Sequence, residues 1–108
     1  MSFHVDIVAP EAVVWSGDAD FLVAKTVEGE IGVLTDHEPL MAALATGVVV
    51  VEAGDEKVTV GMHGGFLQIV DNNVTLLTDR AKLTEGDDRG RALEVAKRLR
   101  AEEEAVEG

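Results

Sequence analysis

Carboxylates and an imidazole are gathered in the segment EGEIGVLTDHEPL, which spans residues 28–40. Paired carboxylates can act as general acid and base where an apolar pocket shifts the pKa of one of them. Here the acids fall in two polar turns, Glu28-Gly29-Glu30 and Asp36-His37-Glu38, where solvation is the default state. The two turns flank a short strand-like run, an arrangement that suits a docking edge. Contact with a partner is therefore the favoured interpretation, and a small acid–base catalyst using Glu28 or Glu30 is kept as the enzymatic alternative.

Other catalytic or metal chemistry has little support in the sequence. The chain has no Cys, and its histidines, His4, His37 and His63, show no HxH or HExxH spacing. Ser16 lacks the GxSxG context of a serine nucleophile. The glycines of residues 61–65 precede neither a Lys-Ser/Thr pair nor a helix, so a strand turn or bulge is favoured over a phosphate loop. We expect no active site and no metal site.

Composition narrows the classes of partner. The chain of 108 residues carries a formal net charge of −12, which disfavours nucleic acids and anionic membrane surfaces. Its longest purely apolar run, Val48–Val51, is far too short to cross a bilayer. The N-terminus shows no signal peptide. We expect a soluble chain that reaches a membrane only through a partner.

Short apolar runs separated by turn residues predict a β-rich domain. Val is abundant, and its branched Cβ favours strands. About eight strands are expected, which suggests two packed sheets. Their approximate ranges are residues 3–8, 13–15, 21–27, 31–34, 48–52, 58–62, 66–70 and 74–78. Residues 40–45 are expected to form one helical turn, because Pro39 is suited to a helix start.

The character of the chain changes near Thr84-Glu85-Gly86, which divides it into a β-sandwich of residues 1–85 and a helical segment of residues 86–108. Apolar residues downstream recur every three or four positions, giving the stripe Ala92, Val95, Ala96 and Leu99. The predicted helix begins near Asp88, with Asp87 or Asp88 as its cap, and ends near residue 105 or 106. So short a helix needs a surface for its stripe.

Several motifs carry a resemblance to one family. They are VWSG at residues 14–17, EGEIG followed by HxPL within residues 28–40, the glycine pair Gly64-Gly65, and NVTLLTDxA at residues 73–81. Together these motifs resemble the epsilon subunit of bacterial F-type ATP synthases along nearly the whole chain. The resemblance implies a mostly β protein: a two-sheet antiparallel β-sandwich of about ten strands, followed by a short C-terminal helix.

The resemblance also implies a function without catalysis in this chain. Such a subunit belongs to the central stalk of the rotor and couples the c-ring to the gamma subunit during ATP synthesis and proton transport. It lies peripherally, at the cytoplasmic face of the cell membrane. Glu30 would contact the c-ring and His37 the gamma subunit. A Gly normally precedes that His in the family, whereas this chain has Asp36.

The C-terminal segment departs from the family pattern. Relatives commonly end in a two-helix hairpin that reaches the catalytic head and inhibits ATP hydrolysis, whereas residues 86–108 suffice for one helix. A transient contact of that helix with the head stays open. Asp88, Arg91 and Ala92 match the spacing of a family ATP motif, but Asp87 replaces its aliphatic residue, so no cofactor is expected. The rival to this function is a free-standing acidic β-sandwich adaptor that binds another partner.

Overall fold

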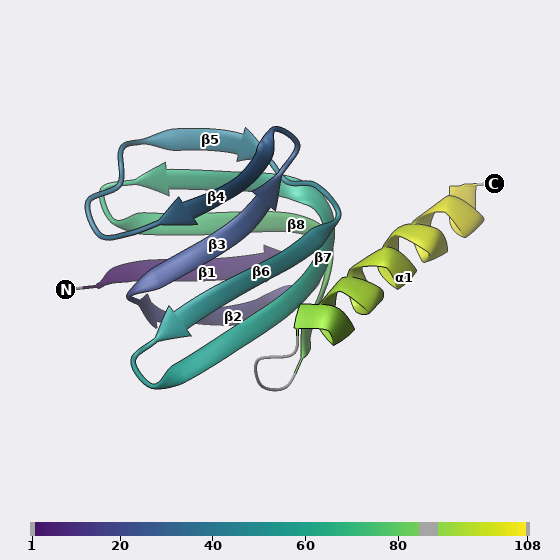
Figure 1. Ribbon diagram of the computed structural model, residues 1–108. Helices are drawn as coiled ribbons and strands as arrows, with labels where there is room; N and C mark the ends of the chain where they lie inside the picture. The colour runs from purple at the N-terminus through teal and green to yellow at the C-terminus, as the bar shows by residue number, and fades with distance from the viewer. Residues whose placement is uncertain (1, 85–88, 108) are drawn as a thin grey trace.

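The computed structural model describes residues 2–84 and 89–107, which form a β-sandwich with one helix on its outside (Figure 1). The fold class predicted from the sequence is confirmed. The elements are β1 (Phe3–Ala9), β2 (Ala12–Ala19), β3 (Phe21–Thr26), β4 (Gly29–Val33), β5 (Leu40–Ala43), β6 (Gly47–Ala53), β7 (Glu56–Val70), β8 (Asn73–Thr84) and α1 (Arg89–Glu107).

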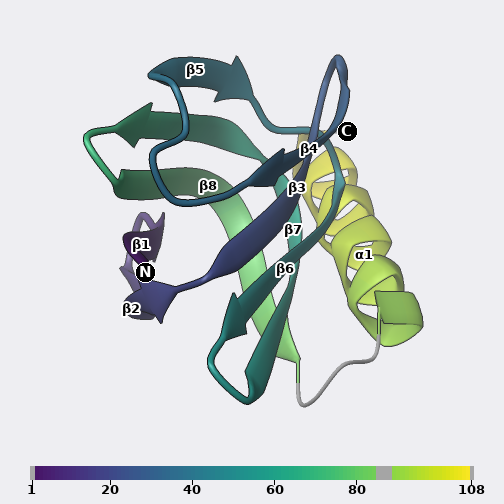
Figure 2. The same cartoon turned by 60° about the vertical axis from the view of Figure 1, so that its left-hand side comes forward.

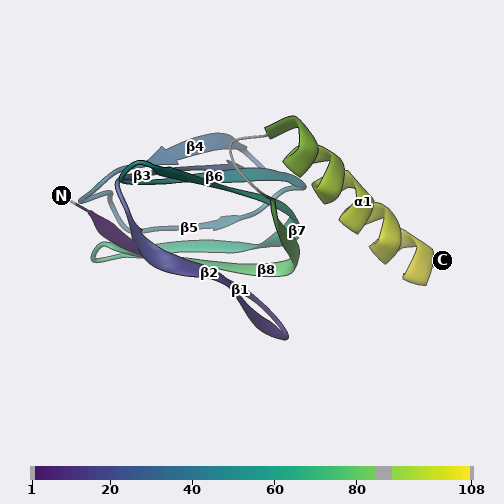
Figure 3. The same ribbon diagram turned by 90° about the horizontal axis from the view of Figure 1, so that it is seen from below.

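The two longest strands, β7 and β8, connect the layers of the sandwich (Figure 3). β7 bends at Gly64 and Gly65, whose φ angles are 73° and 116° and therefore favour glycine. A Cβ on Gly65 would clash with the backbone oxygen of Leu77 in β8. Gly64-Gly65 is thus a bend inside one strand, where the sequence pattern predicted a break between two strands.

The hydrogen-bonded strand order is β2-β1-β8-β7-β6-β3-β4, with β5 also paired to β7. The first layer contains β2, β1, β5 and the halves of β7 and β8 nearest their shared turn. The second layer contains β6, β3, β4 and the other halves. Counting the halves separately gives about ten strands, the number that the resemblance implies. All the pairings are antiparallel except that of β1 with β8, which is parallel.

Residues 40–45 do not form the expected helical turn. Residues 40–43 are strand β5, paired with residues 66–69 of β7. The second half of β7 would otherwise leave its outer backbone groups unpaired, because β6 pairs only with the first half. This requirement, which is set by residues distant in the sequence, outweighs the local helix signal of Pro39.

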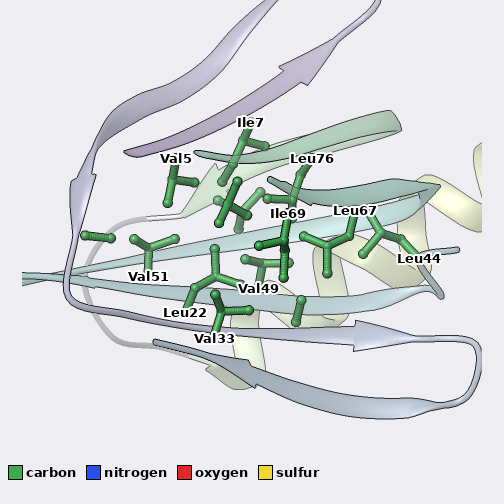
Figure 4. Close-up of a cluster of buried hydrophobic side chains, with 14 of the residues drawn as sticks. Val5, Ile7, Leu22, Val33, Leu44, Val49, Val51, Leu67, Ile69 and Leu76 are labelled. Carbon is green, nitrogen blue, oxygen red and sulfur yellow. The ribbon is translucent and has the colours of Figure 1, made fainter. Parts of the chain in front are cut away.

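The core lies between the layers and is almost entirely aliphatic (Figure 4). Ile7 of β1, Leu22 of β3, Leu67 of β7 and Leu76 of β8 are fully buried there. Inward side chains alternate with outward ones, as in β1, where Phe3, Val5 and Ile7 are buried and the intervening residues are not. The alternate side chains of each strand therefore point to the outside of the sandwich.

Helix α1 packs on the outer face of the second layer, against β6, β7 and β8 (Figures 1 and 2). Ala92 and Ala96 are fully buried, and Val95 and Leu99 partly so, which confirms the predicted apolar stripe. Gly61 permits this contact, because a Cβ there would clash with the backbone oxygen of Ala92. The predicted caps, Asp87 and Asp88, lie outside the described residues.

Candidate functional site

The first predicted contact residue, Glu30, lies on the outer face of the second layer. The hairpin before it is fixed by Thr26, whose hydroxyl donates to the carbonyl of Gly29 at 2.6 Å and accepts from the N–H of Glu28 at 3.2 Å. Glu30 is exposed at the start of β4, an edge strand. It lines an open groove of about 300 Å³, whose other lining residues are Val23, Lys25, Gly47, Val48, Val50, Gly90 and Leu93. The hairpin also exposes Val27, which motif reasoning missed.

The second predicted contact residue, His37, lies in the loop between β4 and β5, and is half-buried. Its N–H donates to the carbonyl of Leu34 at 3.2 Å, and its ring Nδ1 lies 2.7 Å from the carbonyl oxygen of Glu38. The preceding residue, Asp36, has a φ of 64°. This is the left-handed region, which explains why a Gly suits the position in resembling sequences.

Glu30 and His37 are separated by the length of β4, and they do not form one site. Glu30 points away from the second layer toward α1, as the shared groove shows. The loop of His37 crosses to the first layer, where β5 follows (Figure 2). Glu30 and His37 thus lie at opposite ends of β4, on segments that lead to different layers.

An exposed apolar surface occupies part of the outer face of the first layer. We call Val8, Met41, Phe66 and Leu77 the apolar face. Met41, Phe66 and Leu77 are 69%, 56% and 53% exposed. Phe66 pairs with Leu77, which in turn pairs with Val8. A groove of about 300 Å³ runs between Met41, Phe66 and Leu77. Contiguous exposed apolar surface of this kind indicates a protein interface.

The apolar face was not predicted from the sequence. Its residues come from four strands and meet only through the register of the sheet. The one available signal was alternation in β7, which places the apolar Phe66 and Val70 on the face opposite to the buried Leu67 and Ile69.

A polar cluster borders the apolar face on β1 and β2. Nδ1 of His4 lies 3.2 Å from Asp18, and its Nε2 lies 3.1 Å from Asp6, which accepts from the hydroxyl of Ser16 at 2.6 Å. The pKa of His4 is raised above 6.5, mainly by the hydrogen bond to Asp18. The interaction with Asp6 also raises this pKa, whereas desolvation lowers it. The Ser16 hydroxyl is the main cause that lowers the pKa of Asp6 below 3.8.

Glu28 and Glu30, the residues of the enzymatic alternative, do not form a catalytic site. Glu28 and Glu30 are both exposed, so neither lies in an enclosed apolar pocket of the kind that acid–base catalysis uses. Within residues 2–84 and the described part of α1, no cluster of three His, Asp or Glu side chains could hold a metal ion.

The candidate nucleotide residues are only partly described. Arg91 is exposed on α1, whereas Ala92 is buried against Gly61, and Asp88 lies outside the described residues. The expectation that no cofactor binds at these three residues stays a prediction. No helix in the described parts of the chain has the length and apolar character needed to cross a membrane.

Comparison with known proteins matches this chain to ATP synthase epsilon chains. Residues 2–84 match the family model "ATP synthase, Delta/Epsilon chain, beta-sandwich domain". The chain is 41% identical over 104 residues to the ATP synthase epsilon chain of Streptomyces avermitilis, covering 95% of this chain and 84% of that one. It is 45% identical over 85 residues to the epsilon chain of Frankia casuarinae, covering 78% of this chain and the whole of that one.

Solved structures show the same fold. A chain in the mitochondrial ATP synthase of Euglena gracilis, described as OSCP/F1/c-ring, superposes with a TM-score of 0.73 at 26% identity. The match covers 93% of this chain and 64% of that one. A chain in the central stalk/c-ring structure of Tetrahymena thermophila has a TM-score of 0.62 at 16% identity, which shows likeness of fold alone.

Proposed function

The chain belongs to the delta/epsilon family of ATP synthase subunits, and from this premise we propose that it acts as a non-catalytic link in the central stalk. In this role it joins the gamma subunit to the c-ring, so that proton flow and ATP synthesis are coupled. The observation that carries the proposal is that an exposed apolar face and an exposed acidic hairpin lie on different layers of one sandwich. A link between two rotor components requires such a pair.

The gamma subunit is the proposed partner of the apolar face. Met41, Phe66 and Leu77 are more than half exposed and need a partner that excludes water. The loop of His37 leads directly into β5, which carries Met41, so both features lie on the same side of the molecule. The acids Asp6 and Asp18 at the border favour a partner whose rim is basic.

The c-ring is the proposed partner of the hairpin that carries Glu28 and Glu30. This hairpin projects from the second layer, and its turn exposes Val27 and Glu28 next to the exposed Glu30 of β4. A narrow projection with exposed carboxylates suits a short loop on the partner. The assignment places the chain at the periphery of the membrane, on its cytoplasmic face.

Phe66→Asp tests the gamma contact, since it places a charge in the middle of the apolar face. Binding to the purified gamma subunit should fall at least about tenfold, the usual consequence of losing a central aromatic contact. Leu93→Asp is the matched control, because Leu93 is exposed on α1, beyond the opposite layer. Thermal unfolding of each variant checks its fold. Equal binding by folded Phe66→Asp and Leu93→Asp would contradict the assignment of the apolar face.

The adaptor alternative is tested by recovery of the tagged chain from solubilised membranes. The proposed function expects the ATP synthase subunits to be recovered with it, in proportion to one another. Recovery of a different partner without those subunits would favour a free-standing adaptor.

A further inference from the structure

Asn72 connects three segments that are distant in the sequence. It lies in the turn between β7 and β8, with a φ of 61°. Its carbonyl accepts from the N–H of His4 at 2.9 Å. Its side chain forms two hydrogen bonds with Asp36: Oδ1 accepts from the Asp36 N–H at 2.7 Å, and Nδ2 donates to the Asp36 carboxylate at 2.9 Å. The loop of His37 is thereby fastened to the β7–β8 turn.

The fastening offsets an unfavourable backbone at Asp36. A non-glycine residue is unfavourable in the left-handed region, although Asn and Asp adopt it more readily where their side chains are hydrogen-bonded. Asp36 has that conformation with a φ of 64°, and the reciprocal bonds with Asn72 satisfy both its N–H and its carboxylate. The next residue along the chain is His37. Its position therefore depends on the two hydrogen bonds between Asp36 and Asn72.

The ring of His37 has one defined hydrogen-bonding role. Its Nδ1 lies 2.7 Å from the carbonyl oxygen of Glu38, and a carbonyl oxygen can only accept. In the neutral imidazole, Nδ1 therefore carries the proton and Nε2 presents an accepting lone pair. An accepting nitrogen is matched by an N–H or O–H donor.

We propose that Asn72, through Asp36, is the positioning residue for the His37 contact, and that the partner donates a hydrogen bond to Nε2 of His37. The inference rests on the proposed function, which makes the gamma subunit that partner. The Asp36–Asn72 pair orders the loop before binding, so the cost of ordering does not reduce the affinity.

Asn72→Asp tests the pair with little change of shape. Asp tolerates the left-handed backbone nearly as well as Asn, but the variant replaces the donating NH2 with an oxygen facing the carboxylate of Asp36. Asn73→Asp is the matched control, because it adds the same charge one residue away, where the side chain bonds to Asp71 and not to Asp36. The double variant Asp36→Asn/Asn72→Asp exchanges the two partners and restores one donor and one acceptor.

Binding of each chain to the purified gamma subunit of the same enzyme is the first measurement. Asn72→Asp should bind about tenfold more weakly than wild type, since the bond donated to the Asp36 carboxylate is lost and two carboxylates then face each other, which loosens the loop before binding. Asn73→Asp and the double variant should bind within about twofold of wild type, because both keep a complementary pair. Binding of Asn72→Asp at the wild-type level, or failure of the double variant to recover binding, would overturn the positioning role.

Ring ¹⁵N NMR of His37 in the isolated chain is the second measurement, and it does not depend on the partner. Wild type and the double variant should show one neutral tautomer protonated at Nδ1, whereas Asn72→Asp should show averaged tautomers. Averaged tautomers in wild type would overturn the inference about Nε2. If wild type did not bind gamma, the proposed function would be contradicted, and so would the proposed hydrogen bond from gamma to Nε2 of His37. The NMR result would still decide whether Asn72 positions the ring.

Discussion

Glu30 is the residue on which the proposed c-ring contact depends. It is exposed, and it opposes Lys25 in the β3–β4 pairing. We expect Glu30→Lys to lower ATP-driven proton pumping in vesicles several-fold, because it reverses the charge that meets the partner loop. Its effect on folding should stay within about 0.5 kcal/mol, as is usual for an exposed position.

Glu56→Lys is the control for this prediction. Glu56 is an exposed acid at the start of β7, in the hairpin with β6. The same charge change there should leave pumping unaltered. Equal pumping by enzymes carrying Glu30→Lys and Glu56→Lys would remove Glu30 from the c-ring contact.

His4 makes the stability of the sandwich depend on pH. Its pKa is raised above 6.5 in the folded chain, so its contribution is fully present below 6.5 and is lost as the pH rises through the folded pKa. The pKa of Asp6 is lowered below 3.8, so its contribution is present above 3.8 and lost as the pH falls through the folded pKa. The two contributions therefore overlap in the window between about 4 and 6.5.

His4→Gln should reduce the melting temperature more at pH 5.5 than at pH 8.5, because the charged pair with Asp18 and Asp6 is complete only at the lower value. Thermal unfolding at both pH values measures the difference. A deficit of the same size at both values would show that the ring acts through packing or neutral hydrogen bonds.

The contact between α1 and the sheet is made by small residues. A side chain at Gly61 would meet the backbone of the helix at Ala92, which cannot move without the whole helix. We expect Gly61→Val to displace α1 and to increase hydrogen exchange in the helix, while the strands keep their protection. The substitution should cost roughly 1–3 kcal/mol, as overpacking usually does.

Deletion of residues 87–108 removes the helix from the contact between α1 and the sheet. The remaining sandwich should still unfold cooperatively, because the aliphatic core between the layers contains no residue of α1. In the deleted chain, Gly61→Val should have little effect on stability, since the helix it clashes with is gone. A broad, non-cooperative transition would show that the sandwich depends on its helix.

At the scale of elements, local pattern was sufficient for most strands and for the helix stripe. Ala92 and Ala96 are buried as their spacing predicts. The pattern was misleading at residues 40–45, where the need to pair with β7 exceeds local helix preference. The local pattern did not predict the apolar face, because the neighbours of Phe66 are set by sheet register and not by sequence distance.

For the whole molecule, the position of α1 bears on the control of ATP hydrolysis. α1 is about 28 Å long, at about 1.5 Å per residue. To reach a catalytic head it would have to leave Gly61 and expose Val50, which lies on the outer face of β6. We therefore predict that removal of residues 87–108 from the assembled enzyme changes its hydrolysis rate by less than about twofold, a loss of inhibition below about 0.5 kcal/mol. A several-fold rise would show that the tail inhibits.

The whole account requires one rigid sandwich to hold two partners on separate surfaces. The most direct test uses the immobilised chain as bait for the purified gamma subunit and the purified c-ring, each offered alone. The account predicts that wild type retains both, that Phe66→Asp loses gamma but keeps the c-ring, and that Glu30→Lys loses the c-ring but keeps gamma. Loss of the same partner by both variants, or of neither partner by either variant, would contradict it.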